Sequence, residues 1–292
     1  MTNPWPAIPL DEWKETCATL HMWTQIVGKI RLGHTPWTNH SWHVVLYLTA
    51  RGLTTSPIPF GSRLFQIDFD FIDHRLLIQT DDGARKTIAL QPRSVAAFYR
   101  DVFAQLAALG IQLTINTIPN ELPDGIPFEH DEAHRSYDAE HVNRFWRALL
   151  QADRVMKQFR AGFNGKCSPV HFFWGSFDLA VTRFSGRAAP EHPGGIPHLP
   201  DWVVREGYSR ELSSCGFWPG NDAVPYPAFY AYAYPEPAGF ASTKLRPDAA
   251  FYHADLHEFV LPYDKVRTAS SPDALLLEFL NSSYDAAADL GK

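Results

Sequence analysis

The strongest constraint on the fold is a run of three short strand-like segments separated by turn residues, the first of which alternates between apolar and polar residues. In FQIDFDFI, at positions 65–72, every second residue is apolar, as in a β-strand with one buried face. The pair Asp73-His74 separates this segment from RLLIQT, and Asp-Asp-Gly at 81–83 separates RLLIQT from RKTIAL. Because such short links join antiparallel neighbours, positions 65–90 predict an antiparallel sheet.

Helices on either side of these strands make the predicted fold class α+β. Apolar residues spaced three and four apart predict a helix over 11–30 and further helices after Ser94, Asp138 and Ser271-Pro272. The residues Ser and Asp at these three starts are typical N-caps. Other strands are expected at 42–52, 111–117, 210–217, 228–234 and 258–263.

The chain divides into two halves with the same order of elements. Residues 1–117 form a first α+β half, 118–137 a proline-rich connector, and 138–292 a second α+β half with long Pro/Gly loops. The segment 36–49 aligns without a gap to 169–182, and each half reads helix, antiparallel sheet, helix. We interpret this as a possible internal duplication, with chance similarity as the alternative. A duplication would favour a ligand cleft between the halves.

The composition argues against several classes of partner. The net charge is −6 without a long basic run, so nucleic acid is not expected as a partner. No apolar run reaches the ~18 residues of a membrane span, and the first residues lack the pattern of a secretory signal. Three cysteines are too few for a disulfide framework, and together these features predict a cytoplasmic protein. An aromatic content of 14%, with nine Trp, predicts a large core, an aromatic-lined pocket, or both.

Four long motifs carry a resemblance to a known family. They are TLHMWTQIVGKIRL, TPWTNHSWHVVLYLTARGLTTSPIPFG, HFFWGSFDLAVTRFSGR and GFWPG. On these motifs the chain resembles, over nearly its whole length, a family of bacterial proteins catalogued only as a domain of unknown function. The resemblance implies no activity, cofactor or catalytic residue.

The first candidate site lies in VHFFWGSFDLAVTRFSGR, at 170–187. Asp178 is costly to bury among aromatic residues unless it is paired, and Arg183 and Arg187 could pair with it or bind an anion. If Gly175-Ser176 is a hairpin turn, His171 and Asp178 share a face as diagonal neighbours. If the chain continues as one bulged strand, they cannot touch. The ungapped repeat leads us to favour the bulged strand, and a structural ion pair is the alternative to a site.

Other candidates come from histidines and from the loops of the second half. His40 and Trp42, in NHSWH, could share a pocket wall, although core-edge histidines are the simpler interpretation. In the connector, His130 and His134 could bind zinc, but a solvated charged linker is favoured. Around the Pro/Gly-rich loops at 185–200 and 216–227, further residues could contribute to a site, namely Trp218, Tyr208 and Glu211.

These observations lead to three alternative functions. We favour a small-molecule-binding protein with an aromatic-lined cleft, in which Asp178 and Arg183 anchor the ligand and Trp174 forms a wall. The second alternative is an enzyme, such as a hydrolase, that uses the carboxylates of Asp178 and Glu211 with His171 or His40. The third is a structural or interaction protein whose aromatic residues are all core. No cofactor or metal site is predicted, because the nucleotide-binding, zinc-peptidase and serine-hydrolase signatures are absent. The sequence predicts no oligomeric state.

Overall fold

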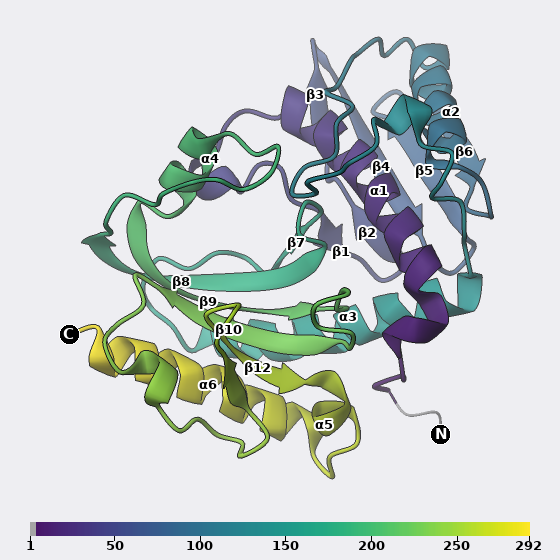
Figure 1. The fold of residues 1–292 in the computed structure, drawn as a ribbon. Helices are drawn as coiled ribbons and strands as arrows, with labels where there is room; N and C mark the ends of the chain where they lie inside the picture. Colours follow the sequence, from purple (N-terminus) through teal and green to yellow (C-terminus); the bar gives the residue numbers. More distant parts are fainter. Residues whose placement is uncertain (1–3) are drawn as a thin grey trace.

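A computed structural model describes residues 4–292, and in this part of the chain two antiparallel sheets of six strands each lie beside one another (Figure 1). The first sheet has the order β1-β2-β4-β5-β6, with β3 paired to β4, and the second has the order β11-β12-β10-β9-β8-β7. The first sheet contains β1 (Tyr47–Leu48), β2 (Gly52–Thr54), β3 (Ile58–Phe60), β4 (Arg63–Asp70), β5 (Arg75–Thr80) and β6 (Arg85–Ala89). The second contains β7 (His171–Phe173), β8 (Asp178–Ala188), β9 (Arg210–Trp218), β10 (Ala228–Tyr234), β11 (Phe251–His253) and β12 (Glu258–Pro262). The predicted α+β class is confirmed.

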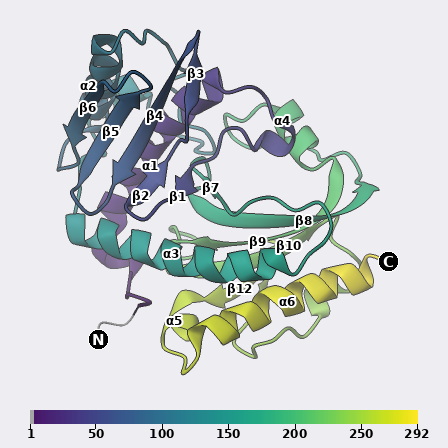
Figure 2. The same ribbon diagram turned by 180° about the vertical axis from the view of Figure 1, so that it is seen from behind.

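Helices cover one face of each sheet. The long helices are α1 (Leu10–His34), α2 (Val95–Ala108), α3 (Ala139–Ala161) and α6 (Pro272–Leu290). The short ones are α4 (Asp201–Gly207), α5 (Tyr263–Arg267), η1 (Asn39–Ser41), η2 (Phe128–His130) and η3 (Phe240–Ser242). Helices α1 and α2 pack on the first sheet, whereas α3 and α6 run side by side behind the second (Figure 2). Among residues 4–292, no helix is both long enough and apolar enough to cross a membrane.

The meander predicted at 65–90 is present as β4, β5 and β6. Phe65 pairs with Thr80 and Asp70 with Arg75, so the turn at Asp73-His74 joins the two strands as expected. Phe65, Ile67 and Phe69 of β4 face the core, while Gln66 and Asp68 form hydrogen bonds on the other face. The alternation in the sequence therefore fixes the register of this sheet, because a shift by one residue would bury the polar set.

The helix starts follow the predicted caps. Ser94 accepts a hydrogen bond from Ala97 N at 3.2 Å, and Asp138 accepts one from His141 N at 2.9 Å. Pro272 begins α6 as predicted, but the Ser271 side chain makes no cap hydrogen bond. These caps satisfy backbone N–H groups that have no partner within the helix.

Two of the predicted strands in the first half are wrong. The segment 42–52 contains only the short β1 and one residue of β2, and 111–117 forms no strand. Leu113 and Ile115 do pack against the core, which explains their alternation in the sequence. Alternation of apolar and polar residues indicates that one face of a segment is buried. A β-strand also needs a neighbouring strand with which to form backbone hydrogen bonds.

The chain turns at Gly175-Ser176, so the favoured single bulged strand is also wrong. Strands β7 and β8 form a hairpin in which Phe173 pairs with Asp178, and Phe177 in the turn has φ 59°. The aligned segment 36–49 instead contains the 3-10 helix η1. The two segments thus differ in structure, and the internal duplication is not confirmed.

The halves are packed together at this hairpin. The indole of Trp174 lies on Gly28 of α1, where a Cβ atom would overlap the ring. Trp174 Nε1 also donates a hydrogen bond to the Val44 carbonyl at 2.7 Å, and a β-bridge joins Leu46 to Phe172. The hairpin is therefore held from both the helix and the sheet of the first half.

The connector at 118–137 is a packed segment rather than the solvated linker that was favoured. Phe128, Asp131 and Tyr137 are buried within it. Its His134 forms an ion pair with Asp131 at 2.7 Å. In the described residues, no group of three or more His, Cys, Asp or Glu side chains is arranged to hold a metal.

Candidate functional site

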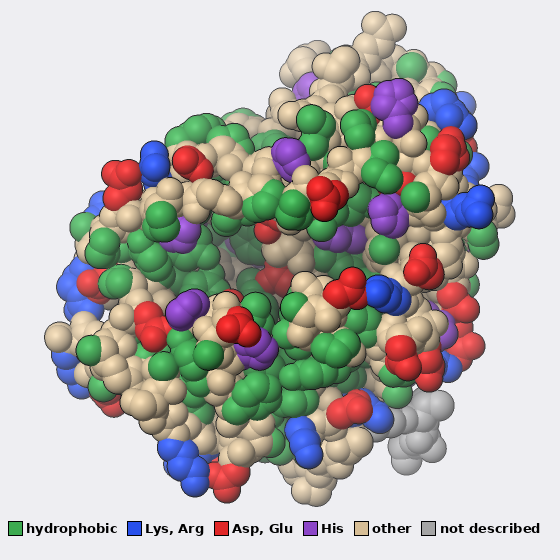
Figure 3. All heavy atoms as spheres, viewed as in Figure 1, with side chains coloured by type: hydrophobic (Ala, Val, Ile, Leu, Met, Phe, Trp, Pro, Cys, Tyr) green, Lys and Arg blue, Asp and Glu red, His purple; other side chains and the backbone are tan. Residues whose placement is uncertain are grey.

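A cavity of about 1350 Å³ lies on the face of the second sheet that α3 and α6 leave uncovered. Its floor comes from β8, β9 and β10, and its roof from η1, α4 and the chain between β8 and α4. The molecule is hollowed here, with hydrophobic and acidic side chains inside the hollow (Figure 3). The second sheet thus has one face buried against helices and one face lining a cavity.

Strand alternation explains which side chains form the floor. On β8, Asp178, Ala180, Thr182 and Phe184 point into the cavity. On β9, Leu212 and Ser214 do so, and Ser214 forms a hydrogen bond with Thr182 at 2.9 Å. On β10 the same face carries a stripe of tyrosines: Tyr230, Tyr232 and Tyr234.

Aromatic residues from both halves enclose the mouth of the cavity. Trp37, before η1, lies 4.9 Å from Trp202 of α4 between ring centroids, and their exposed fractions are 44% and 58%. His40 attaches η1 to α4, because its backbone N donates to the Glu206 carboxylate and its Nδ1 lies 2.9 Å from the Gly207 carbonyl oxygen. The mouth is therefore built from surface aromatics held by a polar contact between the halves.

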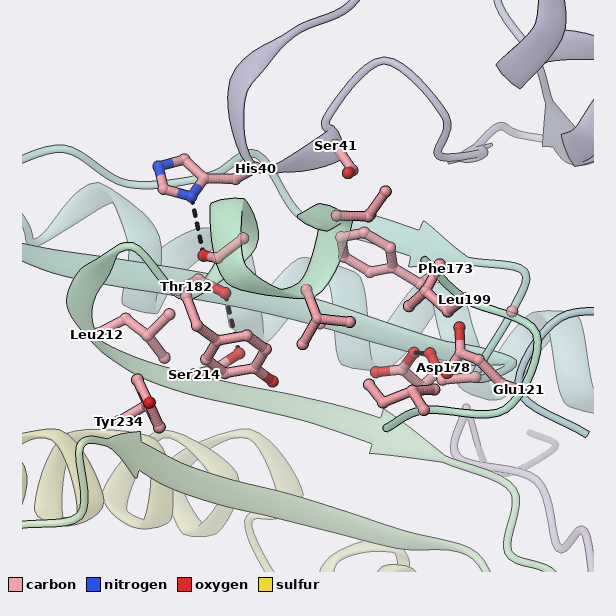
Figure 4. Close-up of a pocket in the computed structure, with 18 of the residues that line it drawn as sticks. His40, Ser41, Glu121, Phe173, Asp178, Thr182, Leu199, Leu212, Ser214 and Tyr234 are labelled. Atoms are coloured by element: carbon pink, nitrogen blue, oxygen red, sulfur yellow. Dashed lines mark hydrogen bonds between the residues drawn. The ribbon is translucent and has the colours of Figure 1, made fainter. Parts of the chain in front are cut away.

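One end of the cavity is acidic (Figure 4). Asp178 is 6% exposed and accepts hydrogen bonds from Ser176 Oγ, at 2.5 Å, and from the Tyr230 hydroxyl. Glu121, from the connector, points to the same place. Two carboxylates from separate parts of the chain thus meet at this end, and Glu258 of β12 lines the same cavity.

Burial and mutual repulsion keep protons on these carboxyl groups. Burial raises the pKa of Asp178, and its two hydrogen bonds oppose this. Burial, followed by the nearby charge of Asp178, raises the pKa of Glu121 to about 7 and that of Glu258 to about 7. Two glutamates near the Asp178 carboxylate are therefore partly protonated at neutral pH.

The tyrosines beside this acidic end act as hydrogen-bond donors. Tyr208 and Tyr232 hydroxyl oxygens lie 2.9 Å apart. Burial, and after it the neighbouring charges, raises the pKa of Tyr230 and of Tyr232 well above the usual value of a phenol. Burial likewise raises the pKa of Tyr208. The phenols stay protonated at physiological pH and surround the carboxyl groups with donors.

Among the described residues that line the cavity, none is Lys or Arg. Apart from the tyrosines, the titratable side chains that line it are acids and histidines, namely Glu121, Asp178, Glu236, Glu258, His40, His43, His192 and His257. A low-dielectric cavity with carboxylates and without Lys or Arg has a negative potential. It disfavours phosphate or carboxylate ligands and favours cationic or neutral ones.

Comparison with known proteins adds one result. Residues 5–292 match the family of unknown function DUF5996. The chain belongs to this family. No curated protein and no solved structure matches the chain. For this member of DUF5996, the argument about function therefore rests on the geometry of its cavity.

Six of the ten residues selected from the sequence line the cavity of this DUF5996 protein. They are Asp178, Trp174, Trp218, Tyr208, His40 and Trp42. The hairpin at Gly175-Ser176 brings two of them, Trp174 and Asp178, to opposite ends of one turn. The part of the prediction that placed aromatic walls and one buried aspartate in a common cleft therefore agrees with the structure.

The expected pairing of Arg183 with Asp178 does not occur. The two residues are five positions apart on β8, so their side chains point to opposite faces. Arg183 instead lies over the ring of Phe159, 3.4 Å from its centroid, and donates a hydrogen bond to the Phe159 carbonyl. It belongs to the packing between β8 and the helices, away from the cavity.

Three further candidates also lie outside the cavity. Glu211 forms an ion pair with Arg187 at 2.6 Å on the other side of the sheet, so it makes no carboxylate pair with Asp178. His171 is fully buried, and its Nε2 lies 3.2 Å from the Tyr47 hydroxyl. Burial, with nearby arginines as lesser causes, lowers the pKa of His171 to about 3. A histidine that stays neutral and buried is not available as a general base.

The sequence analysis missed Glu121, Glu258 and the tyrosine stripe. The stripe had a signal, because AFYAYAY places tyrosine at every second position of a predicted strand. Glu258 begins a predicted strand but has no distinguishing neighbour. Glu121 lies in an irregular segment, where no periodicity predicts the direction of a side chain.

Proposed function

We propose that the protein binds a small organic molecule in the cavity on the second sheet. The observation that carries this proposal is a cavity of about 1350 Å³ that opens at a mouth and has aromatic walls and several polar groups. Ligand sites are commonly of this kind, and this cavity is larger than the roughly 300–1,000 Å³ typical of drug-sized ligands.

The alternative of a purely structural protein is less consistent with the polar groups. Glu121 and Glu258 have no hydrogen-bonding or ion-pairing partner for their carboxyl groups within residues 4–292. Burying such groups without partners is unfavourable, and a cavity gives up packing contacts as well. Carboxyl groups without partners and a large cavity both lower stability, but a ligand site needs both of them.

An enzyme is the second candidate, and the carboxyl groups are the observation that favours it. Carboxyl groups with a pKa of about 7, such as those of Glu121 and Glu258, suit general acid–base catalysis near neutral pH. The constellation first considered, Asp178 with Glu211 and His171, does not supply it. Turnover of p-nitrophenyl esters or glycosides that is lost in Glu258→Gln would favour catalysis over binding alone.

The binding proposal can be tested with a library of small aromatic fragments and ligand-observed NMR. Ala180 lies on the cavity floor, so Ala180→Trp fills part of the space, and Leu212→Trp does the same from β9. Ala104 lies on the exposed face of α2, so Ala104→Trp is a matched control. We expect fragments that bind the wild type and the control but lose binding in both cavity variants.

Two results would overturn the proposal. One is the absence of any fragment binding to the wild type. The other is binding that persists in folded Ala180→Trp and Leu212→Trp proteins, since the fragments would then occupy another surface. Circular dichroism and thermal unfolding establish that each variant is folded.

A further inference from the structure

We propose that the ligand carries a protonated amine, which binds beside Asp178 and Glu121 while its apolar part extends along the tyrosine stripe towards Glu258. This inference rests on the proposed function and names the chemical class of the ligand. It is carried by three features of the cavity: two carboxyl groups that lie side by side with Glu258 in the same cavity, the lack of a hydrogen-bond donor for the two glutamates among residues 4–292, and the absence of Lys and Arg from the described residues that line it.

The carboxyl groups of Asp178 and Glu121 are brought together by the tertiary structure. Asp178 and Glu121 lie side by side in Figure 4, one from β8 and one from the connector. Glu121 Oε1 lies over Gly175, and a Cβ atom at this position would overlap it. The glycine of the hairpin turn thus leaves room for a carboxylate that comes from another part of the chain.

Asp178 and the two glutamates differ in their hydrogen bonding. Asp178 has two donors, Ser176 and Tyr230, and is satisfied within the protein. Glu121 is enclosed on most sides and points into the cavity, yet no described residue donates a hydrogen bond to its carboxyl group. Glu258 also lacks a donor among residues 4–292. An ammonium group has three N–H donors and a positive charge, so it would supply what both groups lack.

Aromatic rings beside the acidic end of the cavity also favour the binding of an ammonium group. Tyr230 and Tyr232 are stacked with ring centroids 6.2 Å apart, and the Tyr208 hydroxyl bonds to Tyr232. A cation close to such rings is attracted by their π-electrons. Farther along β8 and β9 from Asp178, the floor of the cavity carries the apolar side chains of Phe184 and Leu212. A molecule with an amine at one end and an apolar body fits this polarity.

An organic cation fits better than a metal ion. Within the described chain, no three His, Cys, Asp or Glu side chains are close enough together to coordinate a metal. An ammonium group can be bound by one or two carboxylates, such as Asp178 and Glu121, through charge-assisted hydrogen bonds, and does not need the larger ligand set of a metal ion.

Binding of an amine would also release protons from the protein. Glu121 and Glu258 hold protons at neutral pH because burial and Asp178 disfavour their ionised forms. A bound cation reverses this preference, so the glutamates ionise on binding. The other titratable groups that interact with them are Tyr208, Tyr230, Tyr232 and Tyr252, whose raised pKa values keep them protonated throughout.

The test uses three matched probes: 4-phenylbutylamine, 4-phenylbutanol and 4-phenylbutyrate. Isothermal titration calorimetry at neutral pH measures each affinity for the full chain and for its variants. We expect the amine to bind roughly tenfold or more tightly than the alcohol, and the carboxylate most weakly. Titrations in buffers of different ionisation enthalpy should show proton release with the amine and none with the alcohol.

Variants locate the effect within the cavity. Glu121→Gln and Glu258→Gln keep the shape of the side chain and remove its charge, so each should weaken the amine roughly fivefold or more. They should leave the affinity of the alcohol within about twofold, since a neutral probe gains little from a charged group. Glu132→Gln, an exposed connector residue without a side-chain partner in the described structure, is the control.

The inference is overturned if the alcohol or the carboxylate binds as tightly as the amine, or if the glutamine variants leave the preference unchanged. It is also overturned if none of the three probes binds at millimolar concentration. In each of these cases the fragment experiment still decides the proposed function by itself. If neutral or acidic fragments bind the wild type but not the Ala180→Trp and Leu212→Trp variants, small-molecule binding is supported and the preference for an amine is excluded.

Discussion

The buried glutamate of β12 gives a quantitative prediction about stability. Replacing it as Glu258→Gln should stabilise the ligand-free protein at alkaline pH. Glu258 has its pKa raised by burial, and then by the charge of Asp178, from 4.5 to about 7. Each unit of this shift corresponds to about 1.4 kcal/mol, so ionised Glu258 lowers the free energy of unfolding by about 3 kcal/mol at most.

The sign of the pH dependence follows from which state holds the proton. Below pH 4.5 the carboxyl group of Glu258 is protonated in both the folded and the unfolded chain, and it makes no difference. Between pH 4.5 and about 7 the unfolded chain releases the proton while the folded chain keeps it, so stability falls as pH rises. Above this window the full cost is present. The glutamine variant has no such loss.

Urea unfolding followed by tryptophan fluorescence measures the effect at the two ends of the window. We expect the variant to exceed the wild type by up to about 3 kcal/mol at pH 8 and by little at pH 4.5. The exposed Glu132→Gln control should change stability by less than about 0.5 kcal/mol at both values. A gain that is equal at both pH values, or a loss at pH 8, would refute the account of Glu258 as a carboxyl group held without a partner.

Two further predictions concern packing. Gly28→Ala should destabilise the protein by about 1–3 kcal/mol in urea unfolding, because the new Cβ overlaps the Trp174 indole. Gly33→Ala, later in the same helix, has open space and should stabilise by about 0.5–1 kcal/mol; equal effects would contradict the close contact at Gly28. Arg183→Met should lower stability by about 1–3 kcal/mol, because it removes the contact with the Phe159 ring and carbonyl. Its affinity for a cavity-binding fragment should equal that of the wild type, and a large loss would place Arg183 in the site after all.

The sequence predicts those parts of the fold that depend on neighbouring residues. It does not predict the parts whose structure depends on contacts between residues far apart in the chain. The meander of β4 to β6 and the caps at Ser94 and Asp138 follow from patterns within a few residues. The segment 111–117 has the pattern of a strand without a partner strand. At Gly175-Ser176 the local sequence correctly indicated a turn. The alignment with 36–49 favoured a continuous strand instead, and this was wrong because the two similar segments fold differently.

The site shows the same division. Asp178 stood out because a carboxylate among aromatic residues needs an explanation, and it lies in the cavity. The predicted pairing of Asp178 with Arg183 was wrong. The two residues are an odd number of positions apart on β8, and such residues lie on opposite faces of a strand. Glu121 could not be found in this way, because the position of an irregular segment depends on contacts such as those of Asn120 with Gln25 of α1.

The strand β10 shows why one sheet can serve both the core and a cavity. Positions 230, 232 and 234 are tyrosines that line the cavity, whereas Phe229 and Ala231 between them are buried on the other face. A face meant for core packing would place aliphatic residues or Phe at the tyrosine positions too, because a buried hydroxyl needs a partner. A face meant for water would not keep three large rings in a row. Tyrosine at every second position suits neither a packed core nor a face exposed to water, because its ring is apolar and its hydroxyl is polar. Such a stripe, next to Asp178 and Glu258, is expected on a surface that is enclosed by protein and left open for a ligand.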